Sequence, residues 1–467
     1  MNFILIIVYW AVGLIMAGTQ YKINFSIKNI VLENTLPSEA VSDPAVKKLL
    51  VSFLKRLLLS TVIFGLLLFS ILFIPYDSIV MLLFFVCMFG NMSCQFVINI
   101  KAIEEMHELK LERGWVTENS KVIVDLKTMR LKNRRLFPVW WFIFPLAAFI
   151  VIVLIGLKMG NGSNSTVFSQ IFMMNLLIFI PFMLIGLWIY YLVRKIPVHA
   201  VTRDSLVNQK VNDVQKSFYG RMILAMLVFA VIMSGITMWS ALNNSVFLLI
   251  FLLALVILFI GYTFHLVFGY RRETNQLLAS VQPLAYDNED QYWRYGIYMN
   301  PDDHRLFVPS RNTMQLSFNL GRPAGKAILG VIGVLILGLM IGLSAFLGYN
   351  DFTPHPFQAE VIRSTRTLEL KHAFVIKKIS LNDIQSVELV NNEVKNADKI
   401  SGTNTENYYT GTFSYKNQKM YLLIFRKTPE VVYIKAKSDN YYINERTVKD
   451  TRKMFENLKE EIQNGGH

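Results

Sequence analysis

Cysteine is nearly absent from this sequence, which contains only Cys87 and Cys94. Both lie in one apolar segment, on the same face of a helix, and about 10 Å of helical rise separates them. That distance is too long for a disulfide between them, so we interpret both as packing residues. No cysteine follows residue 94, so a carboxy-terminal domain must fold without disulfides of its own.

Catalytic signatures are also missing. The sequence has no Gly-rich phosphate-binding loop, no His-Glu-x-x-His helix and no Ser-centred nucleophile elbow. Asp302, Asp303 and His304 could be pictured as metal ligands, but adjacent side chains in one turn cannot all point at the same ion. A solvated turn is the better interpretation. We therefore expect a protein that is not an enzyme and that holds no metal or cofactor.

Charged residues are scarce, at 17%, whereas 53% of the residues are hydrophobic. This excess predicts a polytopic membrane protein rather than a soluble one. Runs of roughly 17 to 25 apolar residues are long enough to cross a bilayer as helices. They occur at about residues 3–18, 57–75, 79–99, 138–158, 169–193, 221–241, 246–269 and 326–347, which predicts eight spans.

Lys and Arg are concentrated in the first, third, fifth and seventh loops. Because loops that carry them stay in the cytoplasm, we expect a multi-pass cell-membrane protein with both termini extracytoplasmic. The basic run at residues 127–135 fits this topology and contact with anionic lipid, so no nucleic-acid partner is expected. Residues 1–18 lack a basic leader and a cleavage site, which favours a retained helix over a signal peptide.

Polar and small residues mark two of the spans. Asn91, Gln95 and Asn99 recur at i, i+4, i+8 in the third span and form a candidate intramembrane polar stripe. Either hydrogen bonding between helices or a transport site would explain the stripe. In the eighth span, Gly338 and Gly342 form a small-xxx-small face, which suits packing inside the bundle or a homodimer.

Residues 287–323, here called the cytosolic segment, form the only dense polar and aromatic motif. Alternating residues from 292 to 299 predict a strand with Trp293, Tyr295, Ile297 and Met299 on one apolar face. A turn at 300–303 stops this strand, and residues 306–308 are expected to return as the second strand of a hairpin.

We expect the cytosolic segment to be a small β-rich cap that docks a protein partner or lipid headgroups. Its apolar edge and its arginines suit such contacts better than catalysis. The candidate docking residues are Trp293, Tyr295, Asn300, Pro301, Asp302, Arg305 and Arg311.

Residues 357–467 are predicted to form a separate domain of short strands and one last helix. The helix places Val448, Thr451, Phe455, Leu458 and Ile462 on one face and is expected to be capped by Asn444. This order predicts a pleckstrin-homology-like barrel closed by a helix. The Gly/Asn/Thr-rich loop at 391–407 is expected to be its most mobile part.

The predicted fold class is an α-helical polytopic membrane bundle of about eight transmembrane helices, with a cytosolic β-rich insertion and a carboxy-terminal pleckstrin-homology-like β-barrel plus helix. The expected domains are residues 1–269 for spans one to seven, 270–325 for the cytosolic insertion, 326–347 for span eight and 357–467 for the extracytoplasmic domain.

Two stretches resemble known families. The residues Tyr292-Trp293, Asn300-Pro301-Asp302-Asp303 and Phe318-Asn319 are similar to the cytosolic signature of an uncharacterised bacterial multi-pass membrane family, whose layout is similar to Sdp-type toxin-immunity and signal-transducing membrane proteins. Residues 357–462 resemble a bacterial pleckstrin-homology domain, with Ile384-Gln385-Ser386-Val387 and Tyr442-Ile443-Asn444 matching its pattern. The first resemblance implies a membrane-bound regulatory role and assigns no functional residue.

These observations favour a non-enzymatic sensor, immunity or regulatory protein of the bacterial cell envelope. A small-molecule or lipid transporter or permease is the alternative, with the polar stripe as its only candidate lining. The expected partners are the lipid bilayer, a protein at the cytosolic segment 287–323 and an extracellular peptide or protein at 357–467.

Overall fold

The computed structural model describes residues 2–24, 29–116, 125–160, 166–198, 200–243, 246–281, 284, 287–311, 316–373, 375–394, 397–415, 418–437 and 439–464. The chain forms two compact units, each with its own buried core. The first unit comprises Met1–Tyr9, Gly65–Phe89 and Leu335–His467. The second unit comprises Trp10–Phe64 and Gly90–Val334.

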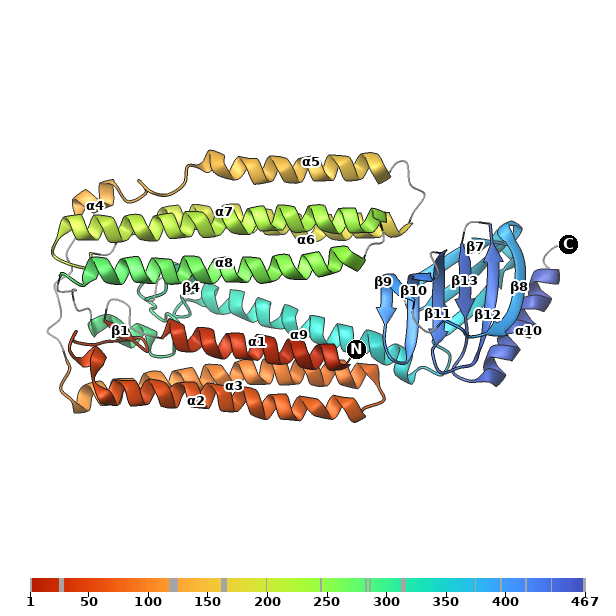
Figure 1. Cartoon of the computed structure of the whole chain (residues 1–467), viewed down its shortest axis with the longest axis horizontal. Coiled ribbons are helices and arrows are strands. Elements are labelled where there is room, and N and C mark those ends of the chain that lie inside the picture. The colour runs from red at the N-terminus through yellow and green to blue at the C-terminus, as the bar shows by residue number, and fades with distance from the viewer. Residues whose placement is uncertain are drawn as a thin grey trace. The chain divides into compact units, whose positions relative to one another are not determined.

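Long helices make up most of the described chain (Figure 1). Among the described residues, 8 helices are long and apolar enough to cross a membrane, in agreement with the number of predicted spans. The helices are α1 (Asn2–Ile23), α2 (Pro44–Leu68), α3 (Asp77–Glu112), α4 (Leu126–Arg130), α5 (Ile143–Gly160), α6 (Thr166–Lys195), α7 (Ser205–Asn243), α8 (Val246–Leu278), α9 (Pro323–Phe352) and α10 (Val448–Asn464).

Local sequence explains where several helices begin and end. α2 begins at Pro44, and the Asp43 carboxylate accepts a hydrogen bond from the Ala45 amide at 2.7 Å. Proline suits the first turn because that turn has no intrahelical acceptor for its amide. α3 continues past its apolar part and ends shortly before Gly114, which adopts a left-handed φ of 63°.

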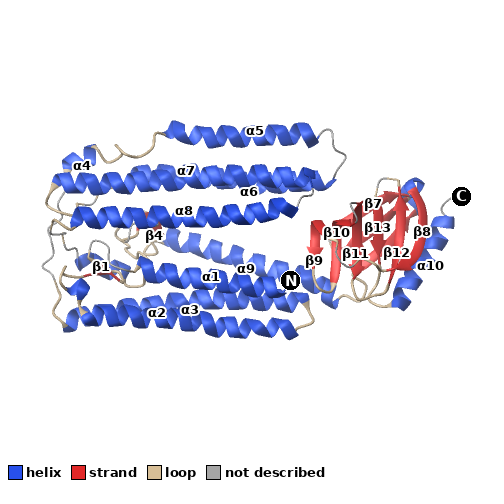
Figure 2. Ribbon diagram, viewed as in Figure 1, coloured by secondary structure: helices blue, strands red, loops and turns tan. Residues whose placement is uncertain are grey.

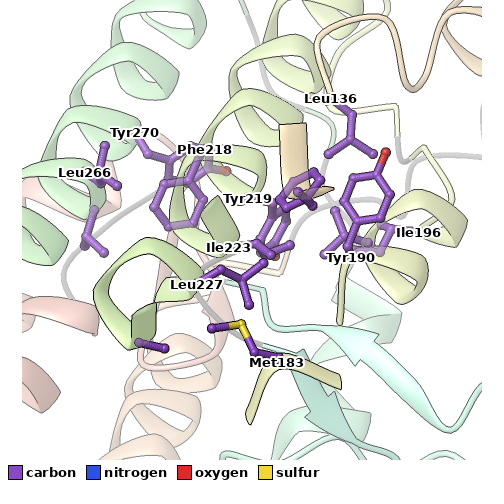
Figure 3. Packing of buried hydrophobic residues seen from close by; sticks show 14 of the residues in the cluster. Leu136, Met183, Tyr190, Ile196, Phe218, Tyr219, Ile223, Leu227, Leu266 and Tyr270 are labelled. Carbon is purple, nitrogen blue, oxygen red and sulfur yellow. The ribbon is translucent and has the colours of Figure 1, made fainter. Parts of the chain in front are cut away.

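The helices α5 to α8 share one core in the second unit, here called the α5–α8 group (Figure 3). Large aromatic side chains fill it, among them Tyr190 of α6, Phe218 and Tyr219 of α7, and Tyr270 of α8. The ring centroids of Phe218 and Tyr270 are 5.0 Å apart. Buried aromatic contacts of this kind hold α6, α7 and α8 together.

A second core lies where the second unit's parts of α1, α2 and α3 meet β1 (Ile30–Val31) and β2 (Asn34–Thr35). We call this assembly the α1–α3 group. Its buried side chains include Phe53 of α2 and Met106 of α3. Because the β1–β2 hairpin contributes to this core, its position is tied to the helices.

The turn between β1 and β2 is strained. Leu32 and Glu33 have φ values of 46° and 57°, as a two-residue hairpin turn with both residues left-handed requires. Glycine or asparagine is preferred there, because other side chains crowd the backbone. The Leu32 side chain is buried in the α1–α3 core, and that packing offsets the strain.

The cytosolic segment does not form the predicted strand at residues 292–299. Asp287–Trp293 is a 3-10 helix, η4, and Gly296 then turns the chain with a φ of 69°. The Met299 amide donates to the Tyr292 carbonyl at 2.8 Å, so this backbone is satisfied locally. The alternating residues predicted a strand, but the backbone groups of a strand need a partner strand to bond. Here hydrogen bonds within local turns satisfy these backbone groups instead.

A hairpin does form later in the segment. β3 (Phe307–Pro309) pairs antiparallel with β4 (Leu316–Phe318). The strand predicted near residues 306–308 is therefore present, but its partner follows it in the chain instead of preceding it.

The strands of the first unit, red in Figure 2, form two sheets among the described residues. One is the meander β5-β6-β7, and the other has the order β8-β12-β13-β11-β10-β9, with β11 and β13 parallel. Among the described residues no strand pairing joins the two sheets, so the predicted closed barrel is wrong. The strands are β5 (Phe357–Ile362), β6 (Thr367–His372), β7 (Val375–Ser380), β8 (Ile384–Asn391), β9 (Asp398–Asn404), β10 (Tyr408–Tyr415), β11 (Gln418–Phe425), β12 (Glu430–Ala436) and β13 (Asn440–Ile443).

The stretch predicted as a mobile loop at 391–407 contains the strand β9. Gly402 of β9 lies opposite Gly411 of β10, and their φ values are 125° and 110°. A Cβ at either position would clash with the backbone of the other strand. Glycine here therefore lets the two strands approach each other closely. Because glycine is also common in loops, the sequence alone did not distinguish this strand from a loop.

α10 has the predicted apolar face but a different cap. Thr447 accepts a hydrogen bond from the Asp450 amide at 3.1 Å and donates to the Asp450 carboxylate at 2.7 Å. Asn444 instead bonds the Phe425 amide at 2.6 Å and its carbonyl at 3.1 Å. The predicted cap residue thus joins strands, and the helix begins at Val448.

Candidate functional site

A buried ionic cluster anchors the cytosolic segment. The Asp290 carboxylate of η4 is 2.8 Å from Lys110 Nζ of α3 and 2.6 Å from an Arg311 guanidinium nitrogen. The Thr35 hydroxyl of β2 donates to the same carboxylate at 2.9 Å. All four side chains are buried. Paired and hydrogen-bonded charges are what a buried carboxylate requires.

Glu33 lies beside this cluster. Its carbonyl accepts a hydrogen bond from Arg311, whereas its buried carboxyl has an oxygen without a hydrogen-bond partner among the described residues. Burial raises the pKa of Glu33 to about 7, with Arg311 opposing the rise and Asp290 adding to it. The carboxyl therefore changes charge near neutral pH.

Next to the cluster is a cavity of about 440 Å³, here called the junction pocket. Its walls come from β1–β2, from the chain after α6, from α7 and from the cytosolic segment. The lining residues are Ile30, Thr35, Ile196, Pro197, Val198, Ala200, Val201, Val211, Asn212, Gln215, Leu284, Glu289, Tyr292, Trp293, Tyr298, Asn300, Asp302, Asp303, Arg305, Val308, Pro309, Ser310 and Arg311.

Aromatic rings form one side of the pocket. Trp293 and Tyr298 are buried with ring centroids 5.2 Å apart, and both pack against Val308 of β3. The Tyr298 hydroxyl donates to the Asp303 carboxylate at 2.9 Å. This aromatic wall is therefore fixed in place by a hydrogen bond as well as by packing.

The pocket's two arginines are already paired. Arg311 is paired with Asp290, and an Arg305 guanidinium nitrogen lies 2.6 Å from the Asp303 carboxylate. Burial alone would raise the pKa of Asp303, but hydrogen bonds from Arg305 and Tyr298 hold it at about 2. Asp303 is thus ionised at physiological pH.

Two other carboxylates of the pocket are not engaged in this way. Among the described residues, the Glu289 and Asp302 side chains have no ion-pair or hydrogen-bond partner. The unpaired charge of the lining is consequently negative. A group of positive charge is the natural complement to such a wall.

Asn319 fixes the turn that carries these residues. Its side-chain oxygen accepts from the Asn300 amide at 3.0 Å, and its side-chain nitrogen donates to the carbonyls of Asn300 at 2.8 Å and Asp303 at 3.0 Å. Gly321 lies against the same turn, and a Cβ there would be 2.5 Å from the Asn300 carbonyl carbon. The turn at 300–305 is therefore rigid.

The cytosolic segment contacts both helix groups of the second unit. Its η4 end is bonded to the α1–α3 group through Asp290. Its hairpin reaches the α5–α8 group, where Phe307 makes an edge-to-face contact with Trp188 of α6, at 5.0 Å between centroids. Leu316 packs on the core of that group. The junction pocket thus lies where the two groups are joined.

Most of the candidate docking residues meet at this pocket. Trp293, Asn300, Asp302, Arg305 and Arg311 line it, whereas Tyr295 is 47% exposed and Pro301 is not part of the lining.

The predicted apolar edge is wrong, because Tyr298, which strand alternation would place on the face opposite Trp293, is buried beside it. Local turns in this segment replace the strand that would have separated their side chains.

The sequence did not reveal the anchoring residues. Lys110 lies in the charged part of α3 that follows its apolar residues, where a lysine usually faces solvent, yet it is only 3% exposed. Asp290 has no local pattern that marks it, because its partner Lys110 lies 180 residues away in the chain. Asn319 belongs to the motif that resembles a known family, but that resemblance assigned it no role. The metal-ligand alternative concerned Asp302, Asp303 and His304, and the described residues contain no cluster of three potential metal ligands.

The polar stripe lies among helices of the α1–α3 group. Asn91 accepts from Ser60 of α2 at 2.8 Å, and Gln95 donates to Thr61 of α2 at 3.0 Å. Asn99 accepts from Asn24 at 3.0 Å. These contacts join α3 to its neighbours, which is what interhelical hydrogen bonding requires.

In the first unit, the β-rich domain is bonded to the turn between α2 and α3. Asn407 donates to the Pro75 carbonyl at 2.9 Å and to the Asp77 carboxylate at 3.0 Å. The Ser78 amide donates to Asp351, at the end of α9, at 2.7 Å. These bonds tie the domain to the helix ends of its own unit.

His372 strengthens the same joint. It is buried, and its Nε2 is 2.6 Å from the Asn350 side-chain oxygen of α9. Burial lowers the pKa of His372 to about 4, so the imidazole is neutral at physiological pH.

Comparison with known families identifies one part of the chain. The family model for the bacterial PH domain matches residues 359–461, which run from β5 to α10. No curated protein and no solved structure matches the chain. The resemblance to the Sdp-type family is not confirmed, and the match supports neither signalling nor immunity. Residues 359–461 are therefore a bacterial PH domain, and the described part of the chain contains 8 helices long and apolar enough to cross a membrane.

Proposed function

We propose that this chain is a non-enzymatic membrane sensor or regulatory protein, with the junction pocket as its ligand-binding site. One observation carries the proposal: the walls of the pocket come from both helix groups and from the segment that joins them. A ligand there contacts both groups at once. Its affinity therefore depends on their arrangement, and binding shifts the population toward one arrangement.

The proposed ligand carries a positive charge next to a small apolar or aromatic body. Glu289 and Asp302 supply the unpaired negative charge, and the wall formed by Trp293 and Tyr298 suits an apolar body. The two arginines are paired with Asp290 and Asp303, so they have little capacity to bind an anion.

The bacterial PH domain is the proposed partner-binding part. α9 runs from the end of the cytosolic segment to this domain, so it gives the two units a covalent link. On the proposed topology the pocket is cytoplasmic, and the PH domain meets an extracellular peptide or protein. Transport by way of the polar stripe is not favoured, because Asn91 and Gln95 are already bonded to α2.

Binding of a matched pair of probes tests the proposal. 2-Phenylethylamine carries a positive charge, and 2-phenylethanol has the same ring without it. We expect only the amine to raise the thermal stability of the purified full chain, and Glu289→Gln to weaken that effect. Glu112→Gln, an exposed carboxylate of α3 outside the pocket, is the control.

Hydrogen exchange measures the sensor part of the proposal. With the amine bound, protection is expected to rise in both β1–β2 and β3–β4, since the pocket touches both hairpins. Equal binding of the alcohol would refute the proposed ligand chemistry. Binding without any change in exchange would refute the sensor role.

A further inference from the structure

A groove between α7 and α8 plays no part in the proposed function. Its volume is about 530 Å³, and from Arg221 to Ile232 its α7 residues lie on one helical face. That face is about 16 Å long, from the helical rise. Phe229 of α7 stacks on Phe259 of α8, with centroids 4.1 Å apart. The lining residues are Phe137, Arg221, Leu224, Ala225, Val228, Phe229, Ile232, Leu255, Leu258, Phe259 and Tyr262.

The groove faces outward from the helix pair. Val228 and Leu258 are 41% and 72% exposed, and both belong to helices able to cross a membrane. Lipid chains are the solvent for exposed apolar side chains at such positions. The apolar part of the groove therefore suits an acyl chain.

A polar cavity of about 100 Å³ adjoins the groove and is lined by residues from Val214 to Arg221 of α7 and from His265 to Glu273 of α8. Arg221 lines both. On α8 the face that carries Tyr262 continues through His265 and Gly269 to Arg272. The groove and the cavity consequently adjoin at Arg221, and together they line a strip that is apolar along most of its length and basic at one end.

The charges at this end favour an anion. Arg221 and Arg272 are exposed, and no carboxylate of the described residues lies within ion-pair distance of either guanidinium. Glu273 also lines the cavity, which leaves two permanent cations against one carboxylate. Guanidinium groups match phosphate oxygens in geometry as well as charge.

We propose that this groove binds one anionic phospholipid. Its phosphate lies between Arg221 and Arg272, and one acyl chain lies along α7 and α8 toward Ile232. The excess positive charge at the polar end selects an anionic headgroup over a zwitterionic one. This site is separate from the junction pocket, so neither proposal depends on the other.

Native mass spectrometry of the full chain, released from detergent, tests the site. The probes are phosphatidylglycerol and phosphatidylcholine with identical acyl chains. We expect phosphatidylglycerol to bind more tightly, and Arg221→Gln or Arg272→Gln each to weaken it roughly fivefold, the effect of one surface cation. Arg203→Gln, an exposed arginine outside the groove, should leave binding unchanged.

Val228→Trp provides an independent variant, because a large ring in the groove excludes the acyl chain without changing charge. We expect it to weaken binding of both lipids while thermal stability stays unchanged. Equal affinity for the two lipids would overturn the proposal. So would phosphatidylglycerol binding that neither Arg221→Gln nor Val228→Trp weakens.

Discussion

At the residue scale, Asp290 is the most consequential side chain of the cytosolic segment. Asp290→Asn would leave Lys110 and Arg311 buried without their anion. Breaking a buried ion pair on one side costs about 3 to 5 kcal/mol. We expect the free energy of unfolding of the full chain, measured by chemical denaturation, to fall by this amount. Glu289→Gln, at the adjacent position, should change stability by about 0.5 kcal/mol or less, and an equal loss for both would contradict the anchoring role.

Glu33 makes stability depend on pH. Its folded pKa is raised to about 7, so the folded state favours the protonated carboxyl. Its contribution is fully present below the ordinary carboxyl pKa and is lost as pH rises through about 7. Glu33→Gln should remove this loss, on the order of 1 to 3 kcal/mol, between pH 5.5 and 8. Chemical unfolding at the two pH values measures the change in the free energy of unfolding. An equal change for the variant and the parent would disprove the role of Glu33.

Single residues of the site could be predicted only in part. Trp293 and Arg311 stood out because an aromatic and basic motif is rare in such an apolar chain. Lys110 and Asp290 did not, since their pairing joins positions 180 residues apart. The spacing of residues in a sequence predicts local secondary structure, but it does not predict which residues far apart in the chain will meet.

At the element scale, α10 contributes one buried apolar side chain to the core of the PH domain. Leu458 is 1% exposed, whereas Phe455 is only partly buried. We expect Leu458→Ala to cost about 2 to 5 kcal/mol and Phe455→Ala to cost less. Limited proteolysis of the full chain, followed at sites in β5–β13, compares the two variants. A larger loss of stability for Phe455→Ala than for Leu458→Ala would mean that a different face of α10 packs on the core.

The elements differ in how well their sequences predict them. The apolar face of α10 followed from its helical period, which burial on one side imposes. β9 was missed because Gly402 resembles a loop residue until its partner strand is known. The strand expected at 292–299 failed for the opposite reason, since its alternating residues found no partner strand.

At the scale of the whole molecule, the distribution of Lys and Arg predicts the topology. Reporter fusions after residues 76, 288 and 466 should read outside, inside and outside, because basic loops stay in the cytoplasm. An inside signal after residue 466 would contradict the proposed placement of the PH domain. The fusion after residue 288 also tests whether the junction pocket faces the cytoplasm.

The helices able to cross a membrane could be predicted because a bilayer imposes both length and composition on a span. The junction pocket could not, since its walls combine Ile30 of β1, Val211 of α7 and Arg311 of the cytosolic segment. No local pattern records that these three segments converge.

β9 is an edge strand of the six-stranded sheet, and its glycine contact with β10 has a further consequence. The register of this pair also shifts between Thr412 and Phe413. Flat, regular edges recruit strands from other molecules, and irregular ones resist such recruitment. We therefore expect this edge, with its register shift and its facing glycines Gly402 and Gly411, to resist pairing with strands of other molecules, at a cost in local strand propensity.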